Sequence, residues 1–507
     1  MKRTVILLLC AALLLCLAGC DQEDSAYVPT GDGLNNSAPA TQPDSGTEDE
    51  DSAFALAYYP DRSLNPYQST DPTNRVLFSL LYQGLFAVDR NYNVVPMLCD
   101  TYNISADMKT YTFHLANAYF SDGTPISAND AAASLNAAKG SPWYGSRLQH
   151  VITISSYGTA VVVDLDTPME NFPMLLDIPI VKASEVNGAR PLGTGPYQYQ
   201  GEALRRQAGW WCSGKLALTA DTIPLRAAEN PAQIRDYFEF SDVGLVAADP
   251  SRQDYADFRS DHELWDCDNG TMLYMVSHKD SKVFADPALR AALTHAIDRN
   301  ALSEAYYHGF AQPATLPASP FSPYYNRTLA ARFAYDPQKF KDALAAAAPE
   351  SNKVTMLLCS DDLMRVRTGL AIEKMLEDCG LDVNIVQVSS DKLVEYLRWS
   401  TYDLYLAQTK LSANMDISAF FGTYTSMNYG GLSDPALYAM SLDALANSGN
   451  FYNLYQNVME KGQLCPILFQ NYAVYATRGQ LSNLAPARDN IFFYDIGRTM
   501  EDALIKE

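Results

Sequence analysis

Residues 354–409 read VTMLLCSDDLMRVRTGLAIEKMLEDCGLDVNIVQVSSDKLVEYLRWSTYDLYLAQT. Apolar and β-branched runs at 354–359, 381–388 and 402–409 predict three strands. The intervening residues 362–379, ended by Gly380, and 391–399 predict two helices. Strands that alternate with helices build a sheet covered by helices on both faces, joined by right-handed crossovers. The stretch therefore predicts an α/β protein.

The first half of the chain predicts further strands and one well-marked helix. Residues 110–115 alternate and then meet the turn Ser-Asp-Gly-Thr-Pro at 121–125, which is typical of a strand followed by a tight turn. Ser127 with Asp130 predicts a capping box at the start of an Ala-rich helix that ends near Lys139. Residues 159–165 predict another strand. A glycine-rich corner, Gly-Thr-Gly-Pro-Tyr at 193–197, leads into a short alternating strand.

Three Asp-Pro pairs mark helix starts in the second half, because a carboxylate can cap the helix while proline occupies its first position. The pairs begin at Asp286, Asp336 and Asp434.

The N-terminus predicts export and a lipid anchor. Lys2 and Arg3 precede an apolar run at 5–17 and the ending Leu-Ala-Gly-Cys at 17–20, the order found in secretory signal peptides. The run is short for a membrane span. Cys20 after Leu-Ala-Gly resembles the lipobox of bacterial lipoproteins, which implies a lipidated Cys20 after removal of residues 1–19. The alternative is an ordinary signal peptide with a chance cysteine.

Residues 20–52 are expected to form a disordered acidic tether. Between positions 21 and 52 there are nine Asp and Glu residues and no Lys or Arg, and such a segment cannot offset its ordering entropy. Its reach is on the order of 30 Å. The whole chain has a formal net charge of −22, so nucleic acid is excluded as an expected partner.

The remaining cysteines and the histidines suggest no metal site and no cofactor. Six cysteines follow Cys20 at wide, irregular spacing without a C-x-x-C pair, which leaves two alternatives open: disulfides, which export permits, and buried free thiols. The six histidines show no i, i+4 pair, and H-E-x-x-H and G-x-S-x-G are both missing. We expect no enzymatic activity.

Several motifs, in order, resemble family 5 solute-binding proteins of ABC transporters, the group that contains oligopeptide-, dipeptide- and nickel-binding receptors. No single motif is decisive, but the series covers about residues 64–495. It comprises Leu-Asn-Pro at 64–66, Tyr-Gln-Gly-Leu at 82–85 with Asp89, Val-Pro at 95–96, Tyr-Thr-Phe-His-Leu at 111–115 with Phe120 and Asp-Gly-Thr-Pro at 122–125, Gly-Thr-Gly-Pro-Tyr at 193–197, Arg290 with Ala-Ile-Asp-Arg at 296–299, and Tyr-Asp-Pro at 335–337.

The resemblance implies a two-lobed fold of the periplasmic-binding-protein type II class, with mixed sheets flanked by helices and lobes joined by crossing strands. Lobe one would comprise residues 53–276 and 469–507, with a subdomain at about 79–170, and lobe two residues 277–468. The ligand would be enclosed when the lobes close. The implied molecule is a monomeric, extracytoplasmic receptor on the cell membrane that captures a peptide and delivers it to ABC permease subunits.

The same resemblance supplies candidate ligand-binding residues. In oligopeptide binders an acidic residue after a strand like 402–409 pairs with the ligand's amino terminus, but here Ser412 stands at that position and Thr409 where a cleft tryptophan is frequent. Backbone and loop groups around 407–414, including Asn414, would hold the ligand's main chain. Asp416 could replace the acid, and its alternative role is to cap a helix at 417–421.

Aromatic residues complete the predicted site. The segment at 141–144 resembles one that carries a cleft tyrosine in the family, so Trp143 or Tyr144 would cover the ligand. The alternative for each is core packing. Tyr274 is a similar candidate. Tyr67, Thr70 and Phe469 match cleft positions more loosely.

Two other functions remain open from the sequence. The missing acid is compatible with the same fold binding a non-peptide solute. A lipoprotein that senses a peptide and signals to a membrane kinase would have the same general features, and gene neighbours would distinguish it from a transport receptor.

Overall fold

The computed structural model contains the alternation predicted for residues 354–409. The strand at 382–388 pairs in parallel with one side of the strand at 353–359. The strand at 404–410 pairs in parallel with its other side. The predicted α/β class is confirmed. In chain order the elements are β16 (Lys353–Cys359), α10 (Leu363–Asp378), β17 (Asp382–Val388), α11 (Ser390–Trp399) and β18 (Leu404–Lys410).

Helices α10 and α11 cover opposite faces of these strands. Successive side chains of a strand point to opposite faces, so Leu357 of β16 faces away from its neighbours Met356 and Leu358. Leu357 belongs to the same hydrophobic cluster as Leu397 of α11, whereas Met356 and Leu358 pack in the cluster that contains Ile372 of α10. Each fully buried aliphatic side chain stabilises the fold by about 1.5–3 kcal/mol.

The structure describes residues 54–213, 216, 218, 220–252, 257–399, 401–482 and 484–496. These residues lie within one compact unit, residues 52–507. The predicted signal peptide, Cys20 and the tether lie outside the described residues.

Strands β16–β18 form one end of an 11-stranded sheet within the described residues. Most strands that are neighbours in this sheet are distant from each other in the sequence. The order continues from β18 through β14 (His262–Ser277), β19 (Cys465–Thr477), β13 (Leu245–Ala248), β1 (Leu56–Tyr58), β12 (Thr222–Ala227), β11 (Ala203–Arg206) and β10 (Tyr197–Gln200), with β15 (Ala311–Pro313) also paired to β19.

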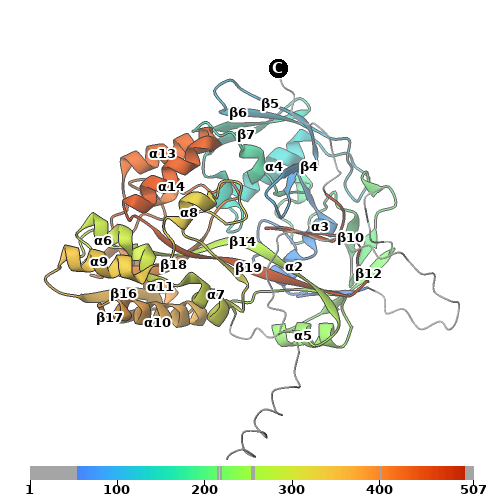
Figure 1. Cartoon of the computed structure of the whole chain (residues 1–507). Helices are drawn as coiled ribbons and strands as arrows, with labels where there is room; N and C mark the ends of the chain where they lie inside the picture. Colours follow the sequence, from blue (N-terminus) through green and yellow to red (C-terminus); the bar gives the residue numbers. More distant parts are fainter. Residues whose placement is uncertain are drawn as a thin grey trace, which may run out of the picture. The chain divides into compact units, whose positions relative to one another are not determined.

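The long antiparallel strands β14 and β19 link the two halves of this sheet, and they run side by side through the middle of Figure 1. β19 pairs with β13 on one side, and the last part of β14 pairs with β18. Their register shifts between Asp268 and Thr271. Gly270 lies there with φ +75°, and a Cβ at this position would come 2.0 Å from Nη2 of Arg488. β14 and β19 are the crossing strands of the predicted fold. The lobe boundaries stay a prediction.

A second, four-stranded antiparallel sheet lies beside helix α4 (Ala128–Lys139). The predicted capping box starts this helix: the Asp130 amide donates to Ser127 Oγ (3.4 Å), and the Ser127 amide donates to Asp130 Oδ2 (2.9 Å). The subdomain boundaries of about 79–170 stay a prediction. The strand order is β5 (Cys99–Ile104), β6 (Thr110–Leu115), β8 (Ala160–Leu165) and β7 (Val151–Tyr157).

Two of the three Asp-Pro pairs cap helices as predicted. Asp286 accepts a hydrogen bond from the Ala288 amide, and Asp434 accepts two from the start of its helix. The third helix also begins at its proline, Pro337, as predicted, but the side chain of Asp336 makes no capping hydrogen bond. Its backbone φ is −159°, and its carboxylate lies 3.7 Å from Lys339 Nζ instead.

The glycine-rich corner packs against the backbone at residues 80 and 81. A Cβ on Gly193 would lie 2.2 Å from the carbonyl oxygen of Leu81, and one on Gly195 would lie 2.4 Å from that of Leu80. Real Cβ atoms do not approach so closely, so both positions require glycine.

Five of the described cysteines are buried free thiols: Cys99, Cys267, Cys359, Cys379 and Cys465. Of the two alternatives left open by the sequence, the structure therefore contains free thiols. Burial raises the thiol pKa of Cys99 and of Cys267 to about 12.

Further helices surround the sheets. They are α2 (Pro72–Arg75), α3 (Phe78–Leu81), α5 (Pro231–Glu239), α6 (Pro287–Ala292), α7 (Arg299–Tyr307), α8 (Arg327–Ala331), α9 (Pro337–Ala347), α12 (Ser418–Phe421), α13 (Pro435–Ala446) and α14 (Phe451–Glu460). Short 3₁₀ turns are η1 (Gly145–Leu148), η2 (Phe172–Leu175), η3 (Ala183–Glu185), η5 (Leu293–Ala296) and η6 (Ser448–Asn450). Two-stranded pairs are β2 (Gln83–Gly84) with β9 (Pro179–Ile180), β3 (Phe86–Val88) with β4 (Val94–Pro96), and β20 (Ala485–Pro486) with β21 (Ile491–Phe492).

Candidate functional site

The end of β18 and the loop after it carry four of the predicted ligand-binding residues, with Thr409 in the strand and Ser412, Asn414 and Asp416 in the loop. Thr409 and Ser412 are partly exposed, whereas Asn414 is 2% exposed. Ser412 Oγ donates a hydrogen bond to Asn414 Oδ1 (2.7 Å). Polar groups therefore meet at the end of this strand, and their contact with a ligand stays a prediction.

Asp416 is buried and bonded on both carboxylate oxygens. Oδ1 accepts a hydrogen bond from the Ser418 amide (2.8 Å), and Oδ2 lies 2.6 Å from Gln149 Nε2 and 3.1 Å from His150 Nε2. Burial would raise its pKa, but the bonds from His150 and Ser418 outweigh burial and lower it. The structure thus shows the predicted contact with the start of α12, together with two partners from another part of the chain.

His150 connects two carboxylates. Its Nδ1 lies 2.9 Å from Asp166 Oδ1 while Nε2 faces Asp416. Only the protonated imidazole can donate from both nitrogens at once. Burial lowers the pKa of His150, but the bonds to Asp416 and Asp166 outweigh burial and raise it. The contact ties the loop after β18 to the start of β7.

The indole ring of Trp143 contacts two cationic side chains, and one of them, Lys410, is the last residue of β18. The guanidinium carbon of Arg75 is 3.8 Å from the centroid of its ring, and Nζ of Lys410 is 4.3 Å from it. Trp143 is partly exposed, as expected of a residue that could cover a ligand. Its neighbour Tyr144 is fully buried and accepts a hydrogen bond from Arg75 Nη2 (2.9 Å).

The other predicted aromatic residues pack in the core. Tyr274 and Phe469 are 1% and 0% exposed, and Tyr274 makes edge contacts with Phe420. Tyr67 is buried and donates to the carbonyl oxygen of Pro179 (2.7 Å). Thr70, in contrast, is exposed. Their roles in ligand binding stay predictions.

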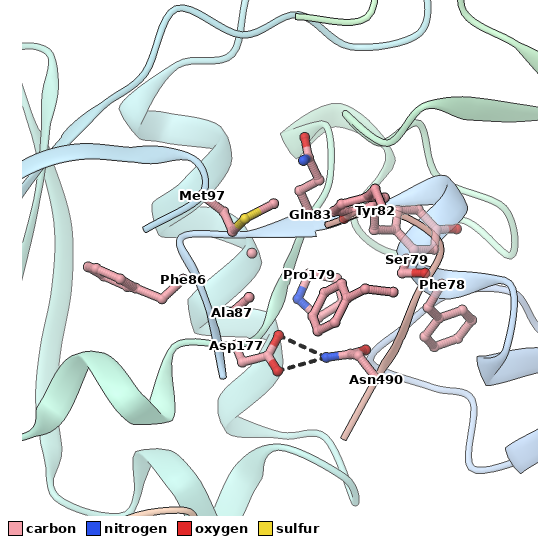
Figure 2. Close-up of a pocket in the computed structure, with 13 residues that line it drawn as sticks. Phe78, Ser79, Tyr82, Gln83, Phe86, Ala87, Met97, Asp177, Pro179 and Asn490 are labelled. Carbon is pink, nitrogen blue, oxygen red and sulfur yellow. Dashed lines mark hydrogen bonds between the residues drawn. The ribbon is translucent and has the colours of Figure 1, made fainter. Parts of the chain in front are cut away.

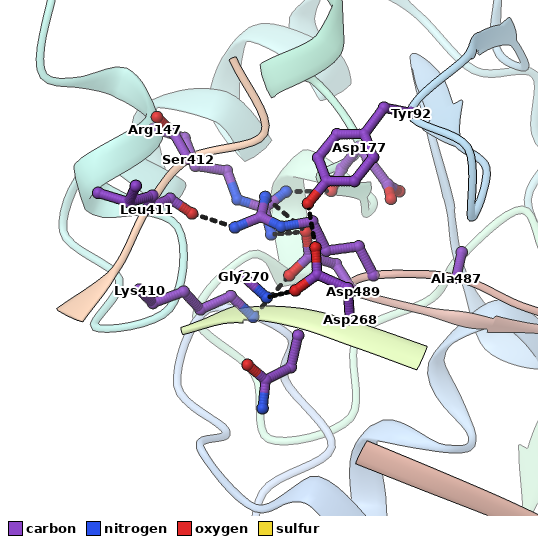
Figure 3. A network of polar contacts seen from close by, with 12 residues as sticks. Tyr92, Arg147, Asp177, Asp268, Gly270, Lys410, Leu411, Ser412, Ala487 and Asp489 are labelled. Atoms are coloured by element: carbon purple, nitrogen blue, oxygen red, sulfur yellow. Dashed lines mark hydrogen bonds and ion pairs between the residues drawn. The ribbon is translucent and has the colours of Figure 1, made fainter. Parts of the chain in front are cut away.

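A charge network adjoins the loop after β18 (Figure 3). Asp489 accepts ion pairs from Lys410 (2.7 Å), Arg147 (3.0 Å) and Arg488 (3.4 Å). Burial would raise the pKa of Asp489, but these three cations hold it well below its usual range. Burial, together with repulsion from Arg488 and Arg147, lowers the pKa of Lys410 to about 8 although Asp489 opposes the shift.

Two further carboxylates extend this network. Asp177 accepts hydrogen bonds from Asn490 Nδ2 (2.8 Å to each oxygen), and burial raises its pKa to about 6. Asp268, at the register shift of β14, accepts from Ser319 Oγ (2.6 Å) and from the Tyr92 hydroxyl. The network therefore joins residues that lie more than 300 positions apart.

A small cavity lies beside Asp177 and Asn490, between α3 and the C-terminal strands (Figure 2). Its volume is about 10 Å³, room for one water molecule at most. It is too small for a solute. We place the candidate site at Trp143, Lys410 and the loop after β18 because predicted ligand-binding residues lie together there.

Sequence reasoning missed four charged residues of this region: Arg75, Arg147, Lys410 and Asp489. Lys410 directly follows a predicted site residue, which is the only local signal. The others come from distant segments, and no spacing along the chain indicates that they meet.

The described residues contain no group of three or more His, Cys, Asp or Glu side chains arranged to hold a metal ion. Within the same described part, no helix has the length and apolarity that a membrane crossing requires.

The sheet order and the crossing strands define an α/β protein, and a family comparison specifies its class. Residues 93–431, more than half of the chain, match the model of "Bacterial extracellular solute-binding proteins, family 5 Middle". The chain belongs to this family, whose members are substrate-binding receptors and not enzymes. The expected family is thereby confirmed.

Individual proteins show how distant the relationships are. The glutathione-binding protein GsiB of Escherichia coli (strain K12) is 26% identical over 319 residues, 59% of this chain, and the match spans 62% of the length of that relative. The substrate-binding protein CtaP of Listeria monocytogenes superposes with a TM-score of 0.71 at 17% identity, covering 87% of this chain and 98% of that one.

The putative peptide binding protein AppA of Clostridium difficile superposes with a TM-score of 0.70 at 18% identity, with the same coverage of 87% and 98%. At these identities the structures establish the fold, and the predicted type II binding-protein architecture is confirmed.

Proposed function

We propose that the chain is an extracytoplasmic solute-binding receptor of an ABC importer that captures a peptide and passes it unchanged to the permease subunits. The observation that carries the proposal is the family match over residues 93–431. A binding protein encloses its ligand and withdraws most of the ligand's surface from water, which permits tight capture at one site.

A peptide or peptide-like solute is supported by two of the similar proteins. One relative is a glutathione-binding protein and one structural neighbour is a putative peptide binding protein. In this chain the partly exposed Thr409, Ser412 and Trp143 surround the end of β18, where strand-edge groups could bond a peptide main chain.

A non-peptide solute is the second candidate, and a specific observation favours it. Ser412 occupies the position of the expected acid, and the neighbouring Lys410 is a cation. A cation cannot pair with a ligand's amino terminus, so neither Ser412 nor Lys410 supplies the anchor expected for the amino end of a peptide.

The lipid anchor on Cys20 and the tether at residues 20–52 remain part of the proposal. They would hold a monomeric receptor on the extracytoplasmic face of the membrane, with a tether long enough to let it reach its permease. The sequence pattern at residues 1–20 supports this arrangement.

The test starts with full-length protein purified from membranes in detergent. Mass spectrometry of the solutes released on unfolding identifies the ligand, and titration calorimetry with that solute on refolded protein measures its affinity. Recovery of a peptide would support the peptide assignment, whereas exclusive recovery of a non-peptide solute would reject it. The intact mass of the same preparation should equal that of a chain that begins with acylated Cys20.

A further inference from the structure

Arg75 is a buried cation without an acidic partner. It ends helix α2, it is 8% exposed, and no carboxylate among the described residues pairs with it within 4.0 Å. Its Nη2 donates to the Tyr144 hydroxyl, while its Nη1 is buried and makes no hydrogen bond. An uncompensated buried charge is costly, so such a group normally faces a counter-ion.

The guanidinium is surrounded by aromatic rings. Its central carbon lies 3.8 Å from the ring centroid of Trp143, 5.0 Å from that of Phe78 and 5.3 Å from that of Tyr144. These rings hold the group in place and partly compensate its charge through cation–π attraction. They provide no hydrogen-bond acceptor for Nη1.

A second unsatisfied donor lies beside it. Nε1 of Trp143 is also buried without a hydrogen-bond partner. Guanidinium and indole N–H groups are donors only, so the group that satisfies both must be an acceptor. The guanidinium carbon lies 3.8 Å from the indole centroid, so the two unsatisfied donors belong to one stacked pair of side chains.

The surrounding charges also favour an anion. Nζ of Lys410 lies 4.3 Å from the same indole ring, and its partner Asp489 is already shared with Arg147 and Arg488. Trp143 is partly exposed and 30% of the Lys410 side chain is exposed, so this pair of side chains reaches the protein surface while the two donor atoms themselves are covered. The cationic patch stands out in a chain with a net charge of −22.

We propose that Arg75 Nη1 and Trp143 Nε1, beside the Lys410 ammonium, form a subsite that binds a carboxylate of the solute. This inference rests on the proposed function, because it specifies a chemical group of the ligand at the same site. A planar carboxylate suits the fork of the guanidinium, and a charge-assisted bond in a partly buried place is stronger than one between neutral groups. The carboxylate can belong to a peptide terminus or to a non-peptide acid.

The test follows the indole N–H resonance of Trp143 in ¹H–¹⁵N spectra of the full chain during titration with sodium acetate. Assignment comes from the Trp143→Phe variant. We expect a saturable shift with acetate that acetamide and sodium chloride at the same concentrations do not produce. Arg75→Gln should weaken the acetate response at least tenfold. Arg332→Gln, which removes an exposed arginine that pairs with Glu460, should leave it unchanged.

Trialanine and succinate then distinguish the two sources of carboxylate. Tighter binding of trialanine assigns the group to a peptide terminus, tighter binding of succinate to a non-peptide acid, and either order supports the subsite. Should Arg75→Gln fail to give a native melting transition, Trp143→Phe replaces it, with acetate affinity measured by calorimetry and an expected loss of at least threefold.

The subsite would be overturned if the Trp143 resonance did not shift with acetate in the unmodified protein. It would also be overturned if the resonance shifted equally in Arg75→Gln. Neither result would affect the receptor proposal, which depends on recovery of a bound solute from membranes.

Discussion

Arg299 fastens three segments together, and its replacement should destabilise the protein strongly. The side chain starts α7 and is 4% exposed. It donates to the carbonyl oxygens of Thr294 (2.9 Å), Ile297 (3.2 Å), Ala314 (3.1 Å) and Pro466 (2.8 Å). These acceptors belong to η5, to the stretch after β15 and to the start of β19.

The magnitude follows from these four carbonyl groups. Arg299→Met keeps much of the side-chain volume but removes every donor, and a buried acceptor left without a partner costs about 1–3 kcal/mol. Relief from burying a charge offsets part of the loss. We therefore expect the free energy of unfolding to fall by about 3–5 kcal/mol, the range seen when one member of a buried polar arrangement is removed. Arg299→Lys should also be costly, because lysine lacks the planar fork.

The assay is equilibrium unfolding in urea, followed by tryptophan fluorescence. Arg332→Met is the matched control, since Arg332 is 49% exposed and pairs with Glu460 at 2.8 Å, and an exposed ion pair contributes only about 0–1 kcal/mol. If Arg299→Met lost no more stability than the control, the role assigned to Arg299 would be wrong.

Two further predictions concern pH and close packing. The raised pKa of His150 means that its bonds to Asp416 and Asp166 stabilise the fold fully below the unfolded pKa of about 6.5 and are lost as pH rises through the folded value. The free energy of unfolding should therefore fall by about 1 kcal/mol as the pH rises from about 6.5 through the folded pKa of His150. In urea titrations at different pH values, His150→Gln should reduce this fall. A Cβ on Gly195 would lie 2.4 Å from the Leu80 carbonyl oxygen, whereas one on Gly209 would meet nothing within 4 Å. Gly195→Ala should therefore cost at least about 2 kcal/mol in the same assay and Gly209→Ala within about 0.5 kcal/mol of zero.

Each of these predictions has a clear contrary result. An unchanged pH profile in His150→Gln would show that another group titrates in that range. Equal stability of the two glycine variants would show that the corner can move away from residues 80 and 81.

Local patterns predicted much of the fold. Hydrophobic period and turn residues were sufficient for the five elements at 354–409 and for the capping box of Ser127, because these signals act within a few residues. The cap expected at Asp336 did not form because its carboxylate lies near Lys339, a partner that the Asp-Pro pattern alone does not indicate.

The site was less predictable, since its contacts join distant segments. The family resemblance indicated Trp143 and the loop that contains Ser412. It gave no indication of Arg75 or Asp489, whose contacts with Trp143 and Lys410 span 68 and 79 positions along the chain. Electrostatic partners of this kind follow from the packed structure and have no spacing rule in the sequence.

The buried cysteines have a practical consequence for how the protein matures. Cys99 and Cys267, each with a thiol pKa of about 12, are almost entirely protonated at neutral pH and react slowly with oxidants. The body of the protein can thus reach its native state without any disulfide-forming catalyst, and it should have the same covalent structure whether it is produced in a reducing or an oxidising compartment.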